Sequence, residues 1–354
     1  MYLEQFILER NISEETAKRY RYSAKKYSDY HGLTFDELIQ EAIDEEENNN
    51  ISKRQRKIKN RLLHFRTYLV NETDLKISTI QSHISQLGTV YKQFDVEVPE
   101  LPRLKDTNLI ETTYIDLPTR EHIAMALEIA GIRIGSLILF MASSGTARAE
   151  CASLTIGDFI KGCEGYYTKE TLPEIVEELY GSIEPIVPTI YVIRQKKNKN
   201  YYTFCTPEAS HAILEWLMLR LKTYEDKEED LSFEDSLWGL SERQITYYFT
   251  NINDDLNFGF KGDYRFFRPH SLRKFHGSNI GLEDTTIDLL HGRSKDSLHA
   301  TYIKTNPEKL KKIYMAAMEN VTIGNRIGKK EIIHEDFTIN LNLNFYGSDY
   351  GITI

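Results

Sequence analysis

The stretch SSGTARAECASLTIGDF, residues 143–159, carries the features from which the fold of this chain is best predicted. The apolar run Ile134–Ala142 precedes the turn in this stretch and predicts a buried helix. Ser144-Gly145 forms a turn of small residues, and Arg148 follows shortly after it. The stretch therefore puts a candidate functional arginine directly behind the predicted core of a domain that begins near Leu117.

Two later stretches add further cations and a tyrosine. RPHSLRKFHGSN, residues 268–279, contains His270 and Arg273. These two side chains share one face of a predicted helix because they lie three residues apart. Arg293 follows in LLHGRSKDS, and Tyr302 follows in LHATYIK.

A basic turn lies between these stretches and residue 148. Ile190–Ile193 and Tyr201–Phe204 are rich in residues that favour strands, and they flank RQKKNKN. This pattern predicts a β-hairpin. Three lysines lie in its turn: Lys196, Lys197 and Lys199.

The same residue types are those needed to break a phosphodiester without a metal ion. A side chain must attack the phosphorus, and Tyr, Ser or Cys can do so. Fixed cations must neutralise the charge on the non-bridging oxygens, which suits arginine because its planar fork meets them bidentately. A lysine or histidine must protonate the leaving 5′-oxygen. The ordered set of cations followed by Tyr302 predicts this chemistry, although each fragment alone is weak.

The ordered set resembles that of the tyrosine recombinases, the family of phage-type integrases and Xer-type resolvases, including archaeal members. Glu150, Leu154 and Asp158 keep the mutual spacing of the family's first motif. His270-Ser271-Leu272-Arg273 matches the family's HxLRH box, and Gly292 lies ten residues before Tyr302, as the glycine of the LGH segment does.

Three departures from the family pattern stand beside these matches. The motif arginine usually comes two residues after the glycine, where this chain has Ala147 and then Arg148. Lys274 replaces the second histidine of the box, and Arg293 takes a position that usually holds His or Trp. The catalytic lysine is expected at Lys196, directly after the first strand, with Lys197 and Lys199 as open alternatives.

The resemblance implies a role for each candidate. Tyr302 would be the nucleophile, Arg148 and Arg273 with Arg293 would hold the phosphate, and Lys196 would protonate the leaving oxygen. His270 would assist proton transfer, or would only orient a neighbour. For Arg148 the structural alternative is an ion pair with Glu150 or Asp158. The resemblance implies no cofactor, neither metal nor ATP.

The implied fold is mainly α with a small β-sheet. It comprises an N-terminal four-helix core-binding domain and an α+β catalytic domain of the tyrosine-recombinase type. The expected bounds are 1–98 for the core-binding domain, 99–116 for a linker, 117–332 for the catalytic domain and 333–354 for a C-terminal tail. Helical spacing and caps in the first ~100 residues agree with four helices. The tail is a candidate for packing on a neighbouring subunit.

The third predicted helix has a basic flank that would contact DNA as part of a clamp. Its candidate DNA-binding residues are Lys53, Arg54, Arg56, Lys57 and Arg61, together with Lys197 and Lys199 of the hairpin turn. The alternative is that this run is only a solvated helix face.

Composition limits the class of protein. The 354 residues carry a net charge of −9, which is adverse for DNA binding unless the cations are gathered on one face. The three cysteines are odd in number and far apart, which argues against disulfides and against zinc. No run approaches the ~18 apolar residues of a membrane span, so we expect a cytoplasmic protein.

The sequence thus predicts a site-specific recombinase or integrase that acts through a 3′-phosphotyrosyl intermediate, as a homo-tetramer on two sites in double-stranded DNA. The alternatives are a recombinase-like DNA-binding protein without catalysis, a type IB topoisomerase-like enzyme, and a helical protein in which the motif is coincidental. The sequence does not distinguish integration of a mobile element from excision or dimer resolution.

Overall fold

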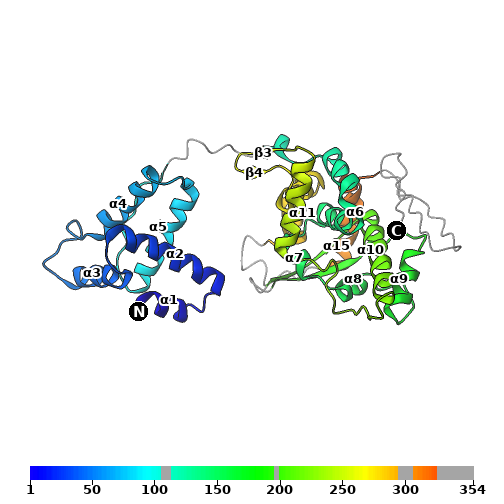
Figure 1. Ribbon diagram of the computed structural model, residues 1–354, viewed down its shortest axis with the longest axis horizontal. Helices are drawn as coiled ribbons and strands as arrows, with labels where there is room; N and C mark the ends of the chain where they lie inside the picture. Colours follow the sequence, from blue (N-terminus) through cyan, green and yellow to red (C-terminus); the bar gives the residue numbers. More distant parts are fainter. Residues whose placement is uncertain (105–112, 195–198, 294–305, 325–354) are drawn as a thin grey trace. The chain divides into compact units, whose positions relative to one another are not determined.

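The computed structural model describes residues 1–104, 113–194, 199–293 and 306–324. The chain divides into two compact units, Met1–Ile110 and Glu111–Ile354 (Figure 1). The described part is mainly helical, with two small antiparallel two-stranded sheets, as the predicted fold class requires.

The first unit contains five helices in its described residues. The additional one, α1, lies before the four that the sequence predicts. Its apolar residues recur at helical spacing, and Phe6 is fully buried. The five are α1 (Tyr2–Glu9), α2 (Glu14–His31), α3 (Phe35–Glu47), α4 (Ile58–Asn71) and α5 (Ile77–Gln93).

The core of the first unit is built from aromatic side chains. Tyr27 of α2 meets Phe65 of α4 edge to face, with ring centroids 5.1 Å apart. Tyr91 of α5 also packs edge to face on the ring of Tyr27. The predicted start of α3 is confirmed, because Thr34 and Glu37 form a reciprocal capping box. This cap satisfies two backbone N–H groups that the first turn of a helix leaves without partners.

The second unit surrounds the long helix α6. Its first described element is the three-residue helical turn η1 (Tyr114–Asp116), and the other elements are given below in chain order. They are α6 (Arg120–Ser144), α7 (Arg148–Ser153), α8 (Ile156–Gly162), α9 (Leu172–Tyr180), β1 (Thr189–Arg194), β2 (Lys199–Phe204), α10 (Pro207–Glu225), α11 (Glu242–Asp255), β3 (Phe260–Lys261), β4 (Tyr264–Arg265), α12 (Pro269–Asn279), α13 (Asp284–Leu290), α15 (Pro307–Ala317) and η2 (Met318–Val321).

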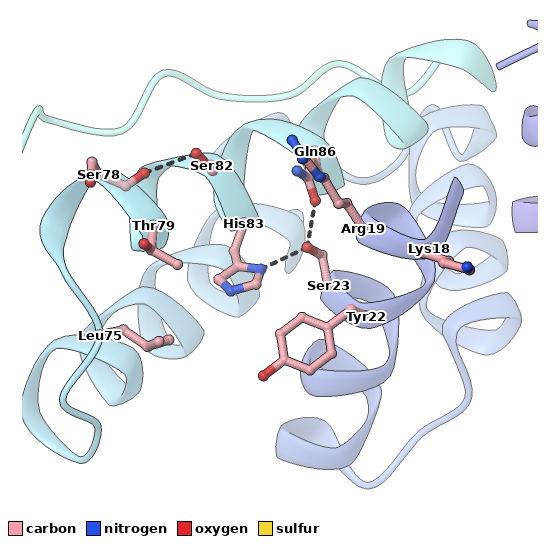
Figure 2. Close-up of a pocket in the computed structure, with 10 residues that line it drawn as sticks. All are labelled: Lys18, Arg19, Tyr22, Ser23, Leu75, Ser78, Thr79, Ser82, His83 and Gln86. Atoms are coloured by element: carbon pink, nitrogen blue, oxygen red, sulfur yellow. Dashed lines mark hydrogen bonds between the residues drawn. The ribbon is translucent and has the colours of Figure 1, made fainter. Parts of the chain in front are cut away.

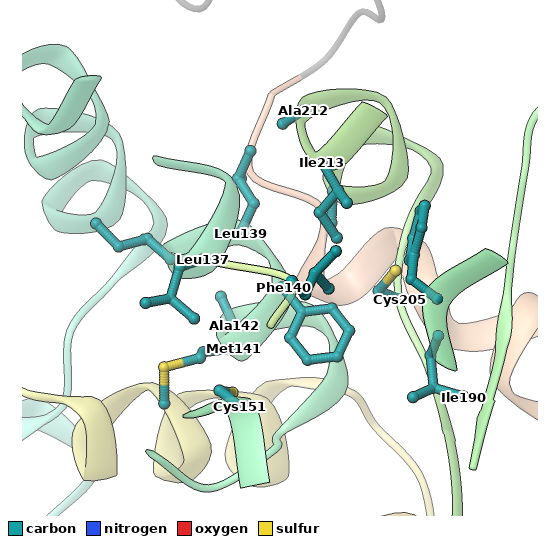
Figure 3. Packing of buried hydrophobic residues seen from close by; sticks show 14 of the residues in the cluster. Leu137, Leu139, Phe140, Met141, Ala142, Cys151, Ile190, Cys205, Ala212 and Ile213 are labelled. Atoms are coloured by element: carbon teal, nitrogen blue, oxygen red, sulfur yellow. The ribbon is translucent and has the colours of Figure 1, made fainter. Parts of the chain in front are cut away.

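Helix α6 supplies the centre of this unit's core. Residues 134–144 are all buried, and α10 and α12 pack against the helix. Figure 3 shows Phe140 and Leu139 of α6 among side chains from β1 and α10. By length and composition alone, residues 114–144 could cross a membrane. The burial of the second half of α6 within the protein accounts for its apolar character.

The predicted β-hairpin is confirmed. Strands β1 and β2 pair antiparallel, with Thr189 opposite Phe204 and Arg194 opposite Lys199. Alternate residues of β1, such as Ile190 and Val192, are buried. The hairpin therefore lies with one face on the core and ends, at its turn, with Arg194 on one strand and Lys199 on the other.

Candidate active site

The segment after α13 closely approaches the end of α6 at Gly145 and strand β2 at Gly292. Gly145 ends α6 with a φ of +65°, and a Cβ atom there would lie 2.2 Å from Nε2 of His291. Gly292 has a φ of +59°, and a Cβ atom there would lie 2.3 Å from the ring of Tyr201. Only glycine allows both the left-handed conformation and these contacts. The turn of the first motif, the hairpin and the LGH-like segment thus meet at one place.

Arg273 of α12 lies at this meeting point, with a side chain that is only 4% exposed. Its guanidinium donates to the carbonyl oxygen of Gly145 at 2.6 Å and to that of His291 at 2.5 Å. Burial lowers the pKa of Arg273 through desolvation, and nearby Tyr201 and Glu150 oppose that effect. Arg273 therefore ties α12 to both glycine segments while its charge is held inside the protein.

Glu150 of α7 is the carboxylate of the site. It accepts hydrogen bonds from the N–H of Ala147 at 2.7 Å and from the hydroxyl of Tyr201 at 2.7 Å. Arg273 lies 3.6 Å away, and Arg194 forms a short ion pair with the same carboxylate. Because Glu150 is buried, these partners offset the cost of removing its charge from water.

Arg194, the last residue of β1, joins three parts of the site. Besides its ion pair with Glu150, its guanidinium donates to the carbonyl oxygen of Gly292 at 2.9 Å and to that of His291 at 3.2 Å. It also lies over the ring of Tyr201, with 5.4 Å between its central carbon and the ring centroid. Its side chain is 16% exposed. Arg194 and Arg273 are therefore bound to the same carboxylate and to the same carbonyl oxygen.

The pKa values of two histidines show which cations gather here. The pKa of His291 is strongly lowered by desolvation, then by His276 and by the cations Arg273, Arg293 and Arg194. The pKa of His270 is lowered by partial desolvation and then by the positive charges of Arg268, Lys274, Arg273 and Arg293. Arg194, Arg273 and Arg293 thus form one cationic cluster around His291, and His270 lies beside Arg273 and Arg293 of this cluster.

The two histidines beneath the cluster are neutral. His276 Nδ1 lies 2.8 Å from His291 Nε2, so one of these nitrogens carries the shared proton. Desolvation, followed by the charge of Arg273, lowers the pKa of His276 to about 3. A neutral pair can fill the space below Gly145 without adding a further positive charge.

Arg148 has different partners from the cluster. It begins α7, and its guanidinium donates to Glu242 at 2.9 Å and to the hydroxyl of Thr246 at 2.6 Å. Both partners belong to α11, and the Arg148 side chain is 42% exposed. The alternative partners expected from the sequence, Glu150 and Asp158, are wrong, although an ion pair of Arg148 with an acid is present.

The displacement of Arg148 follows from the start of α7. Ala147 occupies the cap position before this helix and donates its N–H to Glu150. The next residue is turned by about 100° around the helix axis. Arg148 consequently faces α11. Arg194 lies in this site although the sequence did not single it out. Two sequence features pointed to it: the usual arginine position holds Ala147, and Arg194 is a cation directly before the lysine-rich turn.

Several candidates lie where the structure gives no side-chain description. Lys196, Lys197 and Tyr302 lie outside the described residues, and Lys199 is described only as the first residue of β2. Arg293 is exposed at the end of the described segment, where its N–H donates to the carbonyl oxygen of Asp288 at 2.7 Å. The assigned roles of these residues stay predictions.

The basic run of the first unit is largely paired with acids. Four of the five predicted DNA-binding cations form ion pairs, while Arg54 is exposed. The pairs are Lys53–Glu97, Arg56–Glu46, Lys57–Glu41 and Arg61–Glu41, with separations of 2.5 to 2.8 Å. Only Arg61 lies within α4, since the other four precede it.

Metal binding has no candidate in the described ranges, where no group of three or more His, Cys, Asp or Glu side chains could hold an ion. All three cysteines are free and buried, as the sequence suggested.

Comparisons with known proteins give a likeness in structure. No family model and no curated protein matches the sequence. A lambda integrase tetramer bound to a Holliday junction is similar with a TM-score of 0.50, at 11% identity over 85% of this chain and 75% of that one. XerA recombinase has 15% identity and a TM-score of 0.35, covering 89% of this chain and 97% of that one. The Tn1549 transposon integrase in complex with transposon right end DNA has 12% identity and a TM-score of 0.46, covering 89% and 97%. Together with the helical architecture and the β-hairpin beside α6, the likeness to lambda integrase shows that this chain has the tyrosine recombinase fold.

Proposed function

We propose that this protein is a site-specific DNA recombinase that breaks and rejoins strands through a covalent bond between Tyr302 and a 3′-phosphate. The observation that carries the proposal is the pair of guanidiniums of Arg194 and Arg273, which both contact Glu150 and both donate to the carbonyl oxygen of His291. Guanidinium groups fixed beforehand around a phosphate stabilise the charge that builds on its non-bridging oxygens during displacement. The tyrosine recombinase fold supports the same reaction.

The proposed reaction is a transesterification in which the number of phosphate esters is conserved. The oxygen of Tyr302 attacks the phosphorus, and the bond from phosphorus to the 5′-oxygen breaks. The phenol proton passes to His270, whose pKa is lowered by desolvation and by neighbouring cations, so that it is neutral and can accept it. Lys196 gives a proton to the 5′-oxygen. Strand joining reverses these transfers, with a 5′-hydroxyl of the partner strand as the attacking group.

Double-stranded DNA is the proposed partner, with a homo-tetramer as the active assembly on two sites. The support is the lambda integrase structure, which is a tetramer bound to a Holliday junction. In the first unit, the described cations of residues 53–61 are less suited to phosphate binding than the sequence suggests. Each ion pair that they form with an acid would have to be broken or shared when a phosphate binds.

A hollow between α2 and α5 is better suited to phosphate contact. It encloses about 440 Å³, and its rim carries Lys18 and Arg19 of α2 (Figure 2). Within the described part of the chain, neither cation forms an ion pair with a carboxylate. Ser78, Thr79 and Ser82 of α5 line the same hollow (Figure 2). We therefore propose this surface as a DNA-backbone contact of the first unit, in competition with residues 53–61.

A second candidate function is a DNA-binding protein without catalysis. The observation that favours it is Ala147 at the usual arginine position, with Arg148 bound to Glu242 instead. Such a protein would bind DNA in a salt-dependent manner and cleave nothing.

The test is a covalent selection with wild-type protein and Tyr302→Phe. A pool of nicked duplexes with a random segment is incubated with each protein, and DNA that remains bound in hot detergent is sequenced. A nick lets the short 5′-hydroxyl product diffuse away, so that the covalent intermediate accumulates. We expect protease-sensitive adducts at a recurring sequence with the wild type alone. Adducts that persist with Tyr302→Phe contradict the nucleophile, and DNA binding without any adduct supports the second candidate.

A further inference from the structure

We infer that Arg194, and not Arg148, is the second phosphate-binding arginine of this site. The inference deepens the proposed function and rests on it. It starts from the sequence, in which Ala147 stands at the position of the first-motif arginine. A reaction that develops charge on two non-bridging oxygens is served best by more than one fixed guanidinium.

Arg194 shares its surroundings with Arg273. Both guanidiniums contact Glu150, and both donate to the carbonyl oxygen of His291. Two cations bound to one carboxylate leave a net positive charge, which a phosphate diester can neutralise. Arg148 is instead matched one to one with Glu242. Arg194 is thus the arginine whose charge adds to that of Arg273.

Arg194 retains the capacity to bind an oxygen. Its described partners take one Nε–H and one N–H from each terminal nitrogen. A guanidinium has five N–H groups, so two remain that no described group accepts. Its 16% exposure, compared with 4% for Arg273, leaves these groups more accessible.

The location of Arg194 along the chain fits the same role. It ends β1, two residues before Lys196, and it binds the carbonyl oxygen of Gly292, ten residues before Tyr302. The guanidinium therefore lies where the hairpin that leads to the candidate acid meets the segment that leads to the candidate nucleophile. Ring stacking on Tyr201 and the ion pair with Glu150 fix its orientation before any substrate binds.

The experiment compares Arg194→Gln with Arg148→Gln on the duplex recovered by the covalent selection. Each protein is given that duplex with the ordinary scissile phosphate, and a second duplex in which a neutral methyl group replaces one non-bridging oxygen. We expect Arg194→Gln to form adduct at least about 10²-fold more slowly than wild type on the ordinary duplex. On the methylphosphonate the deficit should shrink to less than about tenfold, because less charge needs a cation there. A purely structural defect would be equal on both substrates. Arg148→Gln should lose less than Arg194→Gln on the ordinary duplex.

Several outcomes overturn the inference. These are an Arg194→Gln rate within about threefold of wild type, an equal deficit on the two substrates, or a greater loss in Arg148→Gln. Glu150 keeps hydrogen bonds from Ala147 and Tyr201 when Arg194 is replaced, so we expect the variant to fold. If the thermal transition of Arg194→Gln is lost, the double variant Glu150→Gln/Arg194→Gln is assayed on both duplexes instead, because it leaves no unpaired buried carboxylate. Arg194→Lys then tests whether a positive charge at this position is enough.

Failure of the proposed function gives a different result. If wild type forms no adduct, the recombinase proposal is wrong, and Arg194 is then judged by phosphate binding alone. Inorganic phosphate at matched ionic strength should raise the unfolding temperature of wild type and Arg148→Gln more than that of Arg194→Gln. Equal shifts in all three proteins would contradict a phosphate-binding role for Arg194.

Discussion

The basic residues 53–61 of the first unit and the arginines around His291 in the second unit differ in the acids that accompany them. In the first region the ion pairs draw on several carboxylates, and Lys57 and Arg61 share Glu41, with Glu45 also close to Lys57. Among the described residues of the second region, Glu150 is the one carboxylate that both Arg194 and Arg273 contact. The two lysines of the first region, Lys53 and Lys57, are 72% and 59% exposed, whereas Arg56 and Arg61 are as shielded as Arg194.

This difference teaches that the local density of cations in a sequence does not predict a phosphate-binding surface. A surface cation with an acidic partner presents little net charge and is screened by salt. A buried pair of guanidiniums with one shared carboxylate keeps an excess of positive charge in a medium of low dielectric constant, where it acts strongly on an incoming anion. The candidate site is therefore the smaller but less neutralised of the two groups.

The largest expected effect concerns the shared carboxylates. Glu150→Ala should lower the free energy of unfolding of the second unit by about 3–5 kcal/mol, because it leaves two buried guanidiniums without their acid. Glu41→Ala in the first region should cost less, about 1 kcal/mol, because Lys57 is 59% exposed and can turn to water, and Glu41 is itself 23% exposed, against 7% for Glu150. Denaturant unfolding of each variant measures both values. Equal losses would mean that the two groups of cations do not differ as proposed.

A somewhat smaller effect is expected on catalysis when Arg273 is replaced. Arg273→Gln should slow adduct formation by about 10²–10³-fold, with DNA binding reduced far less, because the guanidinium acts mainly on charge that develops in the transition state. Arg265→Gln, which removes an arginine from an exposed pair with Asp254, is the matched control and should stay within about twofold of wild type. A loss of binding as large as the loss of rate in Arg273→Gln would indicate a general role in DNA attachment.

Sequence patterns predicted the parts of this molecule that local physics determines. The Thr34–Glu37 cap of α3, the buried helix over residues 134–142 and the β-hairpin follow from spacing and residue type within a short window. The N-terminal helix α1 was missed, although Phe6 and its apolar neighbours have helical spacing. Its eight residues are too few to be stable without the unit that they pack on.

The candidate site was predictable only in part, because its geometry depends on contacts between distant residues. His270 and Arg273 were identified from a short motif, and the structure places His270 beside Arg273 and the other cations of the cluster. The orientation of Arg148 depends on where α7 begins and on Glu242, which is 94 residues away. The position of Arg194 depends on the approach of Gly292 to the hairpin, 98 residues away. No local pattern encodes either distance.

A third prediction uses pH to compare histidines beside each group of cations. His276 has its pKa lowered from an ordinary 6.5 to about 3, so the unfolded chain binds more protons than the folded one between these values. Its contribution to stability is complete above pH 6.5 and is lost as the pH falls. From about pH 7.5 to about pH 5 the loss is about 2 kcal/mol. His31, half-buried beside Arg61, has its pKa lowered by desolvation and by that arginine, while Glu41 opposes the shift.

The measurement is the difference between each variant and wild type, since buried acids act in the opposite direction. Glu208 and Glu215 have pKa values raised to about 7 by desolvation, so they favour folding at lower pH. The destabilisation caused by His276→Gln should therefore shrink by about 2 kcal/mol on acidification, and that caused by His31→Gln should shrink by less. The same pH dependence for both variants would contradict the stronger desolvation of His276, which is the main cause of its lowered pKa.

The smallest expected effect decides between the two DNA-contacting surfaces of the first unit. Lys18→Gln and Arg19→Gln should each weaken binding to a mixed-sequence duplex by up to about 1 kcal/mol. Each should also reduce the slope of log K against log salt by about 0.9, the value for one lost phosphate contact. Lys57→Gln, a matched change at a paired lysine, should reduce the slope by less, because Glu41 and not a counterion already neutralises it. A larger change in slope for Lys57→Gln would return the DNA contact to residues 53–61, and net pairing with acids would then be a poor guide to which surface binds a phosphate.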